Sequence, residues 1–210
     1  MIDALALGGI TGQASAIISG ATAADTGTDP VSGIKWGRWL GGTGTVTFTA
    51  LNGSGTASTT IPAGGIHWIT PPASSGPNSL PVSGTFNYVV AGGTNPTNQA
   101  GAVGTLNSAS LSANFTAMTV NMAVSATVAG TTLSSFASGV PIQNGMVFDS
   151  NKGGVGTVTC SGSCGGVTAG NAVGVFTQGG IGAAVTYGMQ TGPSLGSPTT
   201  VVGGVVAFHR

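Results

Sequence analysis

The chain has 210 residues, of which only 4% are charged, and a formal net charge of zero. This balance argues against nucleic-acid binding, because phosphate contacts need clustered Lys or Arg and the four basic residues are spread from Lys35 to Arg210. With 39 glycines, helix propensity is low, whereas the 40% hydrophobic content and zero net charge differ from the composition of disordered chains. We therefore expect one main domain of the all-β class.

Residues 1–31 are rich in small residues and end in DTGTDP, a composition that predicts an N-terminal arm or linker. The segment is a poor signal peptide, because it carries Asp3 and no basic region before its apolar residues. We expect any export signal to lie upstream of Met1. No other segment has the roughly 18 consecutive apolar residues of a transmembrane helix.

Residues 32–80 predict a smaller β segment that packs on the main body. It begins with SGIKWGRWL at 32–40. In the TVTFTAL stretch that follows, Val46, Phe48 and Ala50 share one face of a strand and threonines occupy the other. NGSG at 52–55 offers a hairpin turn, and IHWIT at 66–70 leads into a Pro-, Ser- and Gly-rich loop.

Residues 81–210 predict an antiparallel, up-and-down β-barrel of about eight strands. Apolar residues alternate in GTFNYVV, and two alternating runs within 104–130 predict a long hairpin. Further strands are predicted at 145–149, 155–160, 172–176, 181–187 and 201–208. Many short strands at regular spacing indicate a sandwich or a barrel.

The two cysteines, Cys160 and Cys164, lie four residues apart. No further Cys and no neighbouring His complete a four-ligand zinc site, so we expect no metal. We predict instead a disulfide at a hairpin tip, which constrains the turn more than it stabilises the domain. A disulfide indicates an extracytoplasmic protein, either secreted, periplasmic or at the cell surface.

The body also resembles a known family in its segments GTFNYVVAGGTNPT, GAVGTLNSASLSANF, TVTCSGSCGG, GVFTQGGIGAAVTYGM and VVGGVVAFHR, and in the early WGRW strand. Taken in their order along the chain, these segments resemble the C-terminal β-barrel of bacterial FecR-domain proteins, over roughly residues 32–210. The pattern of Gly174, Phe176, Tyr187 and the last strand is more distantly similar to transferrin-binding-protein-like surface lipoproteins. The resemblance implies a non-enzymatic, eight-stranded extracytoplasmic barrel that binds a protein or small ligand, and it carries over no catalytic residue.

The chain is poorly supplied for catalysis, so we expect no enzyme and no cofactor. The acid and base groups are His67, His209 and four aspartates, among them Asp149. A Ser-His-Asp arrangement with His67 and Asp149 lacks a G-x-S-x-G elbow. Asp25 and Asp29 are close in sequence but fall in the predicted linker. His209 and Arg210 are expected to form a solvated terminus.

The one candidate binding site is the aromatic and basic cluster of Trp36, Arg38, His67 and Trp68. On a strand, Trp36 and Arg38 point to one face, whereas Lys35 and Trp39 point to the other. Two interpretations stay open. Trp36 and Arg38 either pack against the barrel as core, which the sequence favours, or join His67 and Trp68 in a patch that binds a ligand or partner.

Three functional hypotheses follow. The first is a soluble binding or display module. The second is a structural subunit of an extracellular fibre or surface layer, assembled as a homo-oligomer when residues 1–31 add a strand to a neighbouring sheet. The third is an outer-membrane-spanning barrel, although 6% aromatic residues are few for two interfacial girdles. Surface association with the outer membrane is compatible with the first.

Overall fold

The computed structural model describes residues 12–50, 53–72, 79–143 and 146–210. Nearly every element in these ranges is a β-strand, and the helical elements among them are the short 3-10 segments Ser150–Lys152 and Gln178–Gly180. No helix in these ranges is long and apolar enough to span a membrane. The chain is therefore all-β, as its composition predicts.

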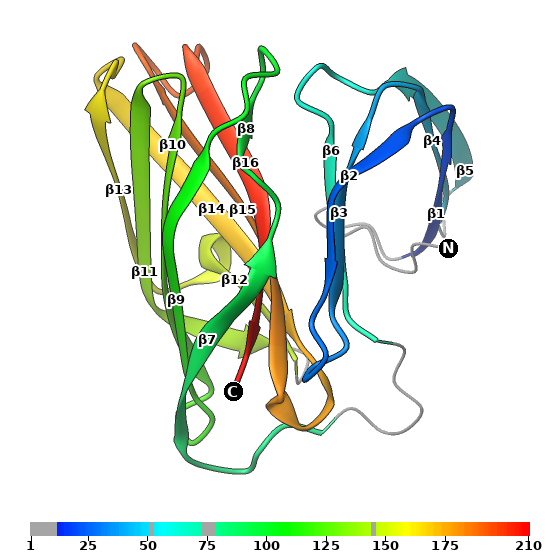
Figure 1. Ribbon diagram of the computed structural model, residues 1–210. Coiled ribbons are helices and arrows are strands. Elements are labelled where there is room, and N and C mark those ends of the chain that lie inside the picture. The colour runs from blue at the N-terminus through cyan, green and yellow to red at the C-terminus, as the bar shows by residue number, and fades with distance from the viewer. Residues whose placement is uncertain (1–11, 51–52, 73–78, 144–145) are drawn as a thin grey trace.

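The body forms a closed, antiparallel β-barrel of eight strands (Figure 1), which confirms the predicted fold class. The wall follows the order β10-β9-β7-β16-β15-β14-β12-β11, and β11 closes it by pairing with β10. β13 also pairs with β11, at the opposite end from β12, so β12 and β13 share one position in the wall. The strands are β7 (Thr85–Gly93), β8 (Thr97–Asn98), β9 (Thr105–Asn114), β10 (Thr119–Val128), β11 (Thr131–Gln143), β12 (Val147–Asp149), β13 (Val155–Gly162), β14 (Val167–Phe176), β15 (Gly182–Gly192) and β16 (Thr200–His209).

Side chains fill the interior of the barrel. Phe115, Phe148, Phe176 and Phe208 are at most 2% exposed, and the rings of Phe115 and Phe148 each lie 5.3 Å from that of Phe176, centroid to centroid. A Cβ added at Gly174 would stand 2.1 Å from Cζ of Phe148, so the ring occupies the space that this glycine leaves. The interior is a packed core, as small barrels require.

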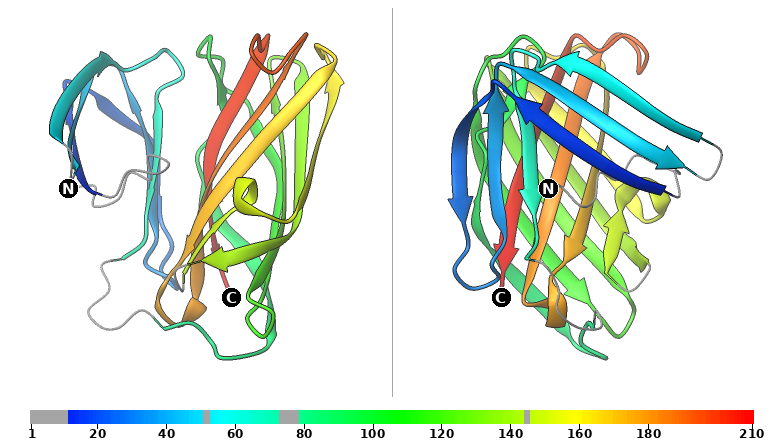
Figure 2. Two further views of the ribbon diagram at one scale, coloured as in Figure 1. Left: turned by 180° about the vertical axis from the view of Figure 1, so that it is seen from behind. Right: turned by 90° about the vertical axis from the view of Figure 1, so that its right-hand side faces the viewer.

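Two three-stranded sheets precede the barrel (Figure 2). Sheet A has the order β1-β4-β5, and sheet B has the order β2-β3-β6. Sheet B lies along the outside of the barrel, where Ile34 and Trp36 pack against Ala184, Val205 and Ala207 of β15 and β16. The strands are β1 (Gly12–Ser19), β2 (Thr22–Thr28), β3 (Lys35–Leu40), β4 (Thr43–Ala50), β5 (Gly53–Thr60) and β6 (Ile66–Thr70).

Two features of the fold differ from what the sequence pattern indicates. Residues 1–31, predicted as an arm or linker, contain β1 and β2, whose small residues alternate too weakly to be read as strands. β11 was absent from the predicted strands, because Gly139 and Pro141 interrupt its pattern. Gly139 adopts a φ of 65°, and the β10–β11 register shifts between Val120 and Met122.

The predicted disulfide is confirmed: Cys160 and Cys164 are bonded, with an S–S distance of 2.11 Å. Cys160 lies in β13 and Cys164 in the turn that joins β13 to β14. The bond therefore fixes the turn between β13 and β14, at one end of the barrel.

Candidate functional site

The candidate residues gather where sheet B meets the barrel. In the β3–β6 pairing Trp36 lies opposite Ile69 and Arg38 opposite His67, whereas Trp68 lies opposite Gly37. Because directly paired residues share a face, Trp36, Arg38 and His67 are on one side of the sheet and Trp68 is on the other. The structure thus brings together three of the four candidates.

Trp36 is buried between two glycines. Its side chain is 8% exposed, and a Cβ added at Gly27 of β2 or at Gly92 of β7 would stand 2.3 Å from its Cζ2 atom. The indole thus fills a slot whose two walls are bare backbone, one belonging to sheet B and one to the barrel. Trp36 is an anchor between the two parts, the packing role that the sequence favours for it.

Arg38 is 5% exposed and its charge is compensated inside the contact. Its Nε donates to Oδ2 of Asp25 at 2.9 Å, and its Nη1 donates to the carbonyl of Gly64 at 3.3 Å. Asn95 Nδ2, from the barrel, donates to the other oxygen of Asp25 at 3.2 Å. A buried guanidinium needs such partners to offset the loss of water.

Asp25 reaches Arg38 because the backbone of β2 is irregular there. The β2–β3 register shifts between Ala24 and Gly27, and Asp25 adopts a φ of 52°. Asp tolerates this left-handed conformation better than most residues. Sequence reasoning placed Asp25 in a linker, since nothing in the alternation of β2 marks a bulge.

His67 bridges sheet B and the barrel through two threonines of the β7–β8 segment. Its Nδ1 lies 2.6 Å from Oγ1 of Thr94, and its Nε2 lies 2.8 Å from Oγ1 of Thr97. Burial and the charge of Arg38 lower the pKa of His67 to about 4, although Asp25 acts in the opposite direction. The ring is therefore neutral at pH 7 and uses one nitrogen as donor and the other as acceptor.

Trp68 belongs to the face of sheet B turned away from this network. Its ring covers Gly37, where a Cβ would stand 2.4 Å from Cζ2, and it stacks on Trp39 at 5.9 Å between centroids. Its buried Nε1 has no hydrogen-bond partner among the residues that the structure describes. Trp68 therefore packs on the opposite face of sheet B and does not join Trp36, Arg38 and His67.

A second polar contact ties the turn between β2 and β3 to the last strand of the barrel. Asp29, 2% exposed, accepts hydrogen bonds from the backbone N–H groups of Val31 and Ser32 and from the Ser32 hydroxyl, and Nδ1 of His209 lies 2.9 Å from its Oδ1. Burial acts to raise the pKa of Asp29, but the bonds from Ser32, His209 and Val31 outweigh it, and the pKa lies below its usual value. His209 is thus part of the contact rather than of a solvated terminus.

Arg210, the last residue, is exposed but also bound to the barrel. Its Nη2 donates to the carbonyl of Gly179 at 2.8 Å, and its guanidinium lies 4.2 Å from the centre of the Phe86 ring. A cation above an aromatic face is attracted to it.

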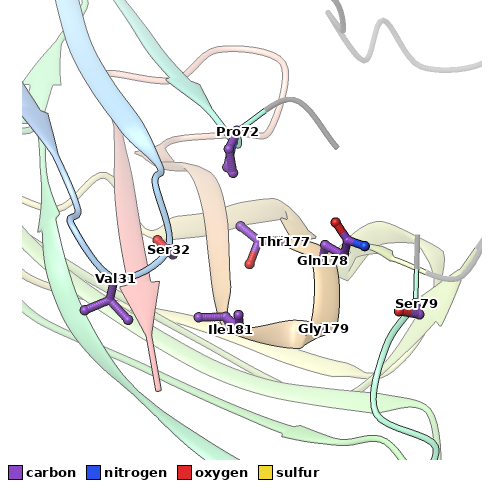
Figure 3. A pocket seen from close by; sticks show the side chains of 8 residues that line it. All are labelled: Val31, Ser32, Pro72, Ser79, Thr177, Gln178, Gly179 and Ile181. Carbon is purple, nitrogen blue, oxygen red and sulfur yellow. The ribbon is translucent and has the colours of Figure 1, made fainter. Parts of the chain in front are cut away.

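An open pocket of about 430 Å³ lies beside the second contact (Figure 3). None of its lining residues titrates, and two of its hydroxyls are already engaged: Thr177 Oγ1 accepts from Gly182 N at 2.8 Å, and Ser32 bonds to Asp29. The pocket offers mainly apolar contacts and backbone. It is lined by Val31, Ser32, Pro72, Ser79, Thr177, Gln178, Gly179 and Ile181.

Within the described ranges, no group of three or more His, Cys, Asp or Glu side chains could hold a metal ion. Comparison with models of known families and with curated proteins found no match to this chain. Its functional interpretation therefore depends on the geometry of the barrel and of the contact with sheet B.

Proposed function

We propose that this chain is a non-enzymatic barrel module of a bacterial surface or periplasmic protein, and that it binds a protein partner through one end of the barrel. The observation that carries the proposal is the packed barrel interior. Because phenylalanine rings and aliphatic side chains occupy the lumen, a ligand has to bind on the outside, where turns and loops offer the adaptable surface.

The outer wall supports a module that works in water. Along β10 the inward side chains Val120, Met122 and Val124 are buried, whereas Asn121 and Ser125 lie on the outer face. A membrane-spanning barrel has the reverse order, apolar outside and polar inside. Sheet B covers one apolar stretch of the outer wall, at Ala184, Val205 and Ala207, whereas other apolar side chains of the wall, such as Phe136, are exposed. These features favour the soluble module over the outer-membrane-spanning alternative.

The end of the barrel that carries the disulfide is the proposed binding end. Three turns meet there, namely residues 129–130, 163–166 and 193–199, because Val128 pairs with Thr131, Thr131 with Gly162, and Thr191 with Thr200. Leu195, in the last of these turns, is 59% exposed. The disulfide holds one of the three turns in a fixed conformation, and it also supports the extracytoplasmic location.

Site-specific photocrosslinking tests the proposal. A benzophenone side chain replaces Leu195 in one variant and Phe136 in another, since Phe136 lies on the wall at β11 and is similarly exposed, at 49%. Each variant is irradiated on cells of the source organism. We expect a discrete protein adduct from position 195 and none from position 136. Adducts from the wall alone, or from neither position, would contradict binding at this end.

The alternative of a fibre or surface-layer subunit is less well supported. In that hypothesis residues 1–31 add a strand to a neighbour, but within one chain β1 already pairs with β4 and β2 with β3. Deleting residues 1–31 would therefore remove two strands from the sheets and also the Gly27 wall of the Trp36 slot. The mass of the intact chain in solution is the better test of assembly.

A further inference from the structure

The contact between sheet B and the barrel concentrates the charge of the whole chain. The sequence has four acidic, four basic and two histidine side chains. Five of them, including both histidines, lie in this one contact: Asp25, Asp29, Arg38, His67 and His209. These groups are buried or half-buried, so they do not contribute to the solubility of the chain.

The charged groups form two clusters on either side of Trp36. We call Asp25, Arg38 and His67, with Thr94 and Thr97, the upper clasp. We call Asp29, Ser32 and His209 the lower clasp. Between the clasps the contact is apolar, with Ile34 and Trp36 against the barrel.

The upper clasp depends on a neutral His67. Each ring nitrogen faces a threonine hydroxyl, and Thr94 Oγ1 also accepts the backbone N–H of Val205 at 3.2 Å. A protonated ring would have two donors and no acceptor, so one threonine could no longer donate to it. It would also place a second cation next to Arg38, directly opposite in the β3–β6 pairing.

The charged groups around His67 are few. Arg38 of β3 opposes protonation, and Asp25 of β2 favours it. From the barrel, the side chains that contact the ring are Thr94 and Thr97, and Asn95 reaches Asp25. Arg38 already neutralises Asp25 through the 2.9 Å contact, so the carboxylate does little to stabilise a second positive charge on His67.

The lower clasp does not involve His67. Nδ1 of His209, from the last strand of the barrel, lies 2.9 Å from Oδ1 of the buried Asp29 carboxylate, and this contact ties the turn between β2 and β3 to the barrel. The other charged side chain nearby, Arg210, is directed to Gly179 and Phe86. Protonation of His67 therefore weakens the upper end of the contact, whereas the lower end keeps its bond between His209 and Asp29.

We propose that sheet B is an acid-operated flap, whose upper clasp opens when His67 is protonated while the lower clasp holds it to the barrel as a hinge. Opening exposes the face of Trp36 together with Val205 and Ala207, an apolar surface hidden at neutral pH. Since His67 titrates near 4 in the docked state and at its usual 6.5 when released, the ratio of open to docked molecules rises about a hundredfold between pH 7 and pH 4.

The three tryptophans of the chain allow a direct test. The protein is labelled with 5-fluorotryptophan and its ¹⁹F spectrum is recorded from pH 7 to pH 4. Trp36 reports on the contact with the barrel, whereas Trp39 and Trp68, on the far face of sheet B, serve as internal controls. We expect the Trp36 signal to move to a solvent-exposed position in acid while the other two signals stay.

Two matched variants identify the group responsible. In His67→Gln, which bonds to hydroxyls but does not titrate, the Trp36 signal should stay constant over the same range. In His209→Gln the transition should remain and move to higher pH, because the hinge is weaker. The inference is overturned if the wild-type Trp36 signal does not change down to pH 4, if all three signals change together as in unfolding, or if His67→Gln titrates like the wild type.

Discussion

At the scale of single residues, glycine decides how closely sheet B approaches the barrel. Trp36 lies flat between Gly27 and Gly92, Trp68 lies over Gly37, and inside the barrel Phe148 lies over Gly174. In each case a large ring occupies the volume that a Cβ would need. These four glycines thus serve packing rather than turns, because a large ring can lie directly on bare backbone.

Gly27→Ala should therefore loosen the contact. The new Cβ would stand 2.3 Å from Trp36, so the indole must leave its slot, and we expect the free energy of unfolding to fall by about 1 to 3 kcal/mol. Gly196→Ala is the control, since nothing lies within 4 Å of a Cβ at that position and its effect should stay within about 0.5 kcal/mol. Urea denaturation of both variants measures the difference, and equal effects would contradict the packing argument.

At the scale of elements, the Cys160–Cys164 bond is local. It closes a loop of four residues in sequence separation, in the turn between β13 and β14. β13 is also held along its length by eight register pairs with β11, from Thr131–Gly162 to Ser138–Val155. The barrel therefore does not depend on the bond for closure.

Replacing both cysteines by serine should leave the barrel intact. Loop closure over so few residues contributes at most about 2 kcal/mol to the free energy of unfolding. In an amide NMR spectrum we expect shifts limited to residues 155–170 and to their partners at 131–134 of β11, together with unchanged signals from β9. Loss of dispersed signals throughout the barrel would show that the fold depends on the disulfide.

At the scale of the whole molecule, stability should decrease in acid. The pKa of His67 is lowered to about 4 from its usual 6.5, so folding favours the neutral ring, and its stabilisation is complete above pH 6.5 and is lost as the pH falls toward 4. The lowered pKa of Asp29 acts in the same direction at lower pH, because folding favours its carboxylate.

We expect the free energy of unfolding to be about 1 to 3 kcal/mol lower at pH 4 than at pH 7, a range that allows for the partial exposure of His67. Urea midpoints across this range measure it. His67→Gln should flatten most of the dependence, and an unchanged slope in that variant would assign the effect to other groups.

The barrel could be predicted from the sequence because its strands alternate strictly, as at Val120, Met122 and Val124. β11 could not, since Gly139 and Pro141 break its period. Alternation alone also predicted that Trp36 and Arg38 lie on the same face of their strand. The other residues of the contact could not be predicted, because Asp25 depends on a bulge in β2, and Thr94, Thr97 and His209 meet His67 and Asp29 only when sheet B packs on the barrel.

We propose that the chain is a module that works in water, with a packed core and a docked sheet B. Sedimentation of the intact protein at neutral pH in buffer without detergent tests this proposal. We predict one species near the chain mass of 20.0 kDa. Aggregation that only detergent reverses would indicate a membrane-spanning barrel, and large regular assemblies would indicate a structural subunit; either result would rule out a monomeric module in water.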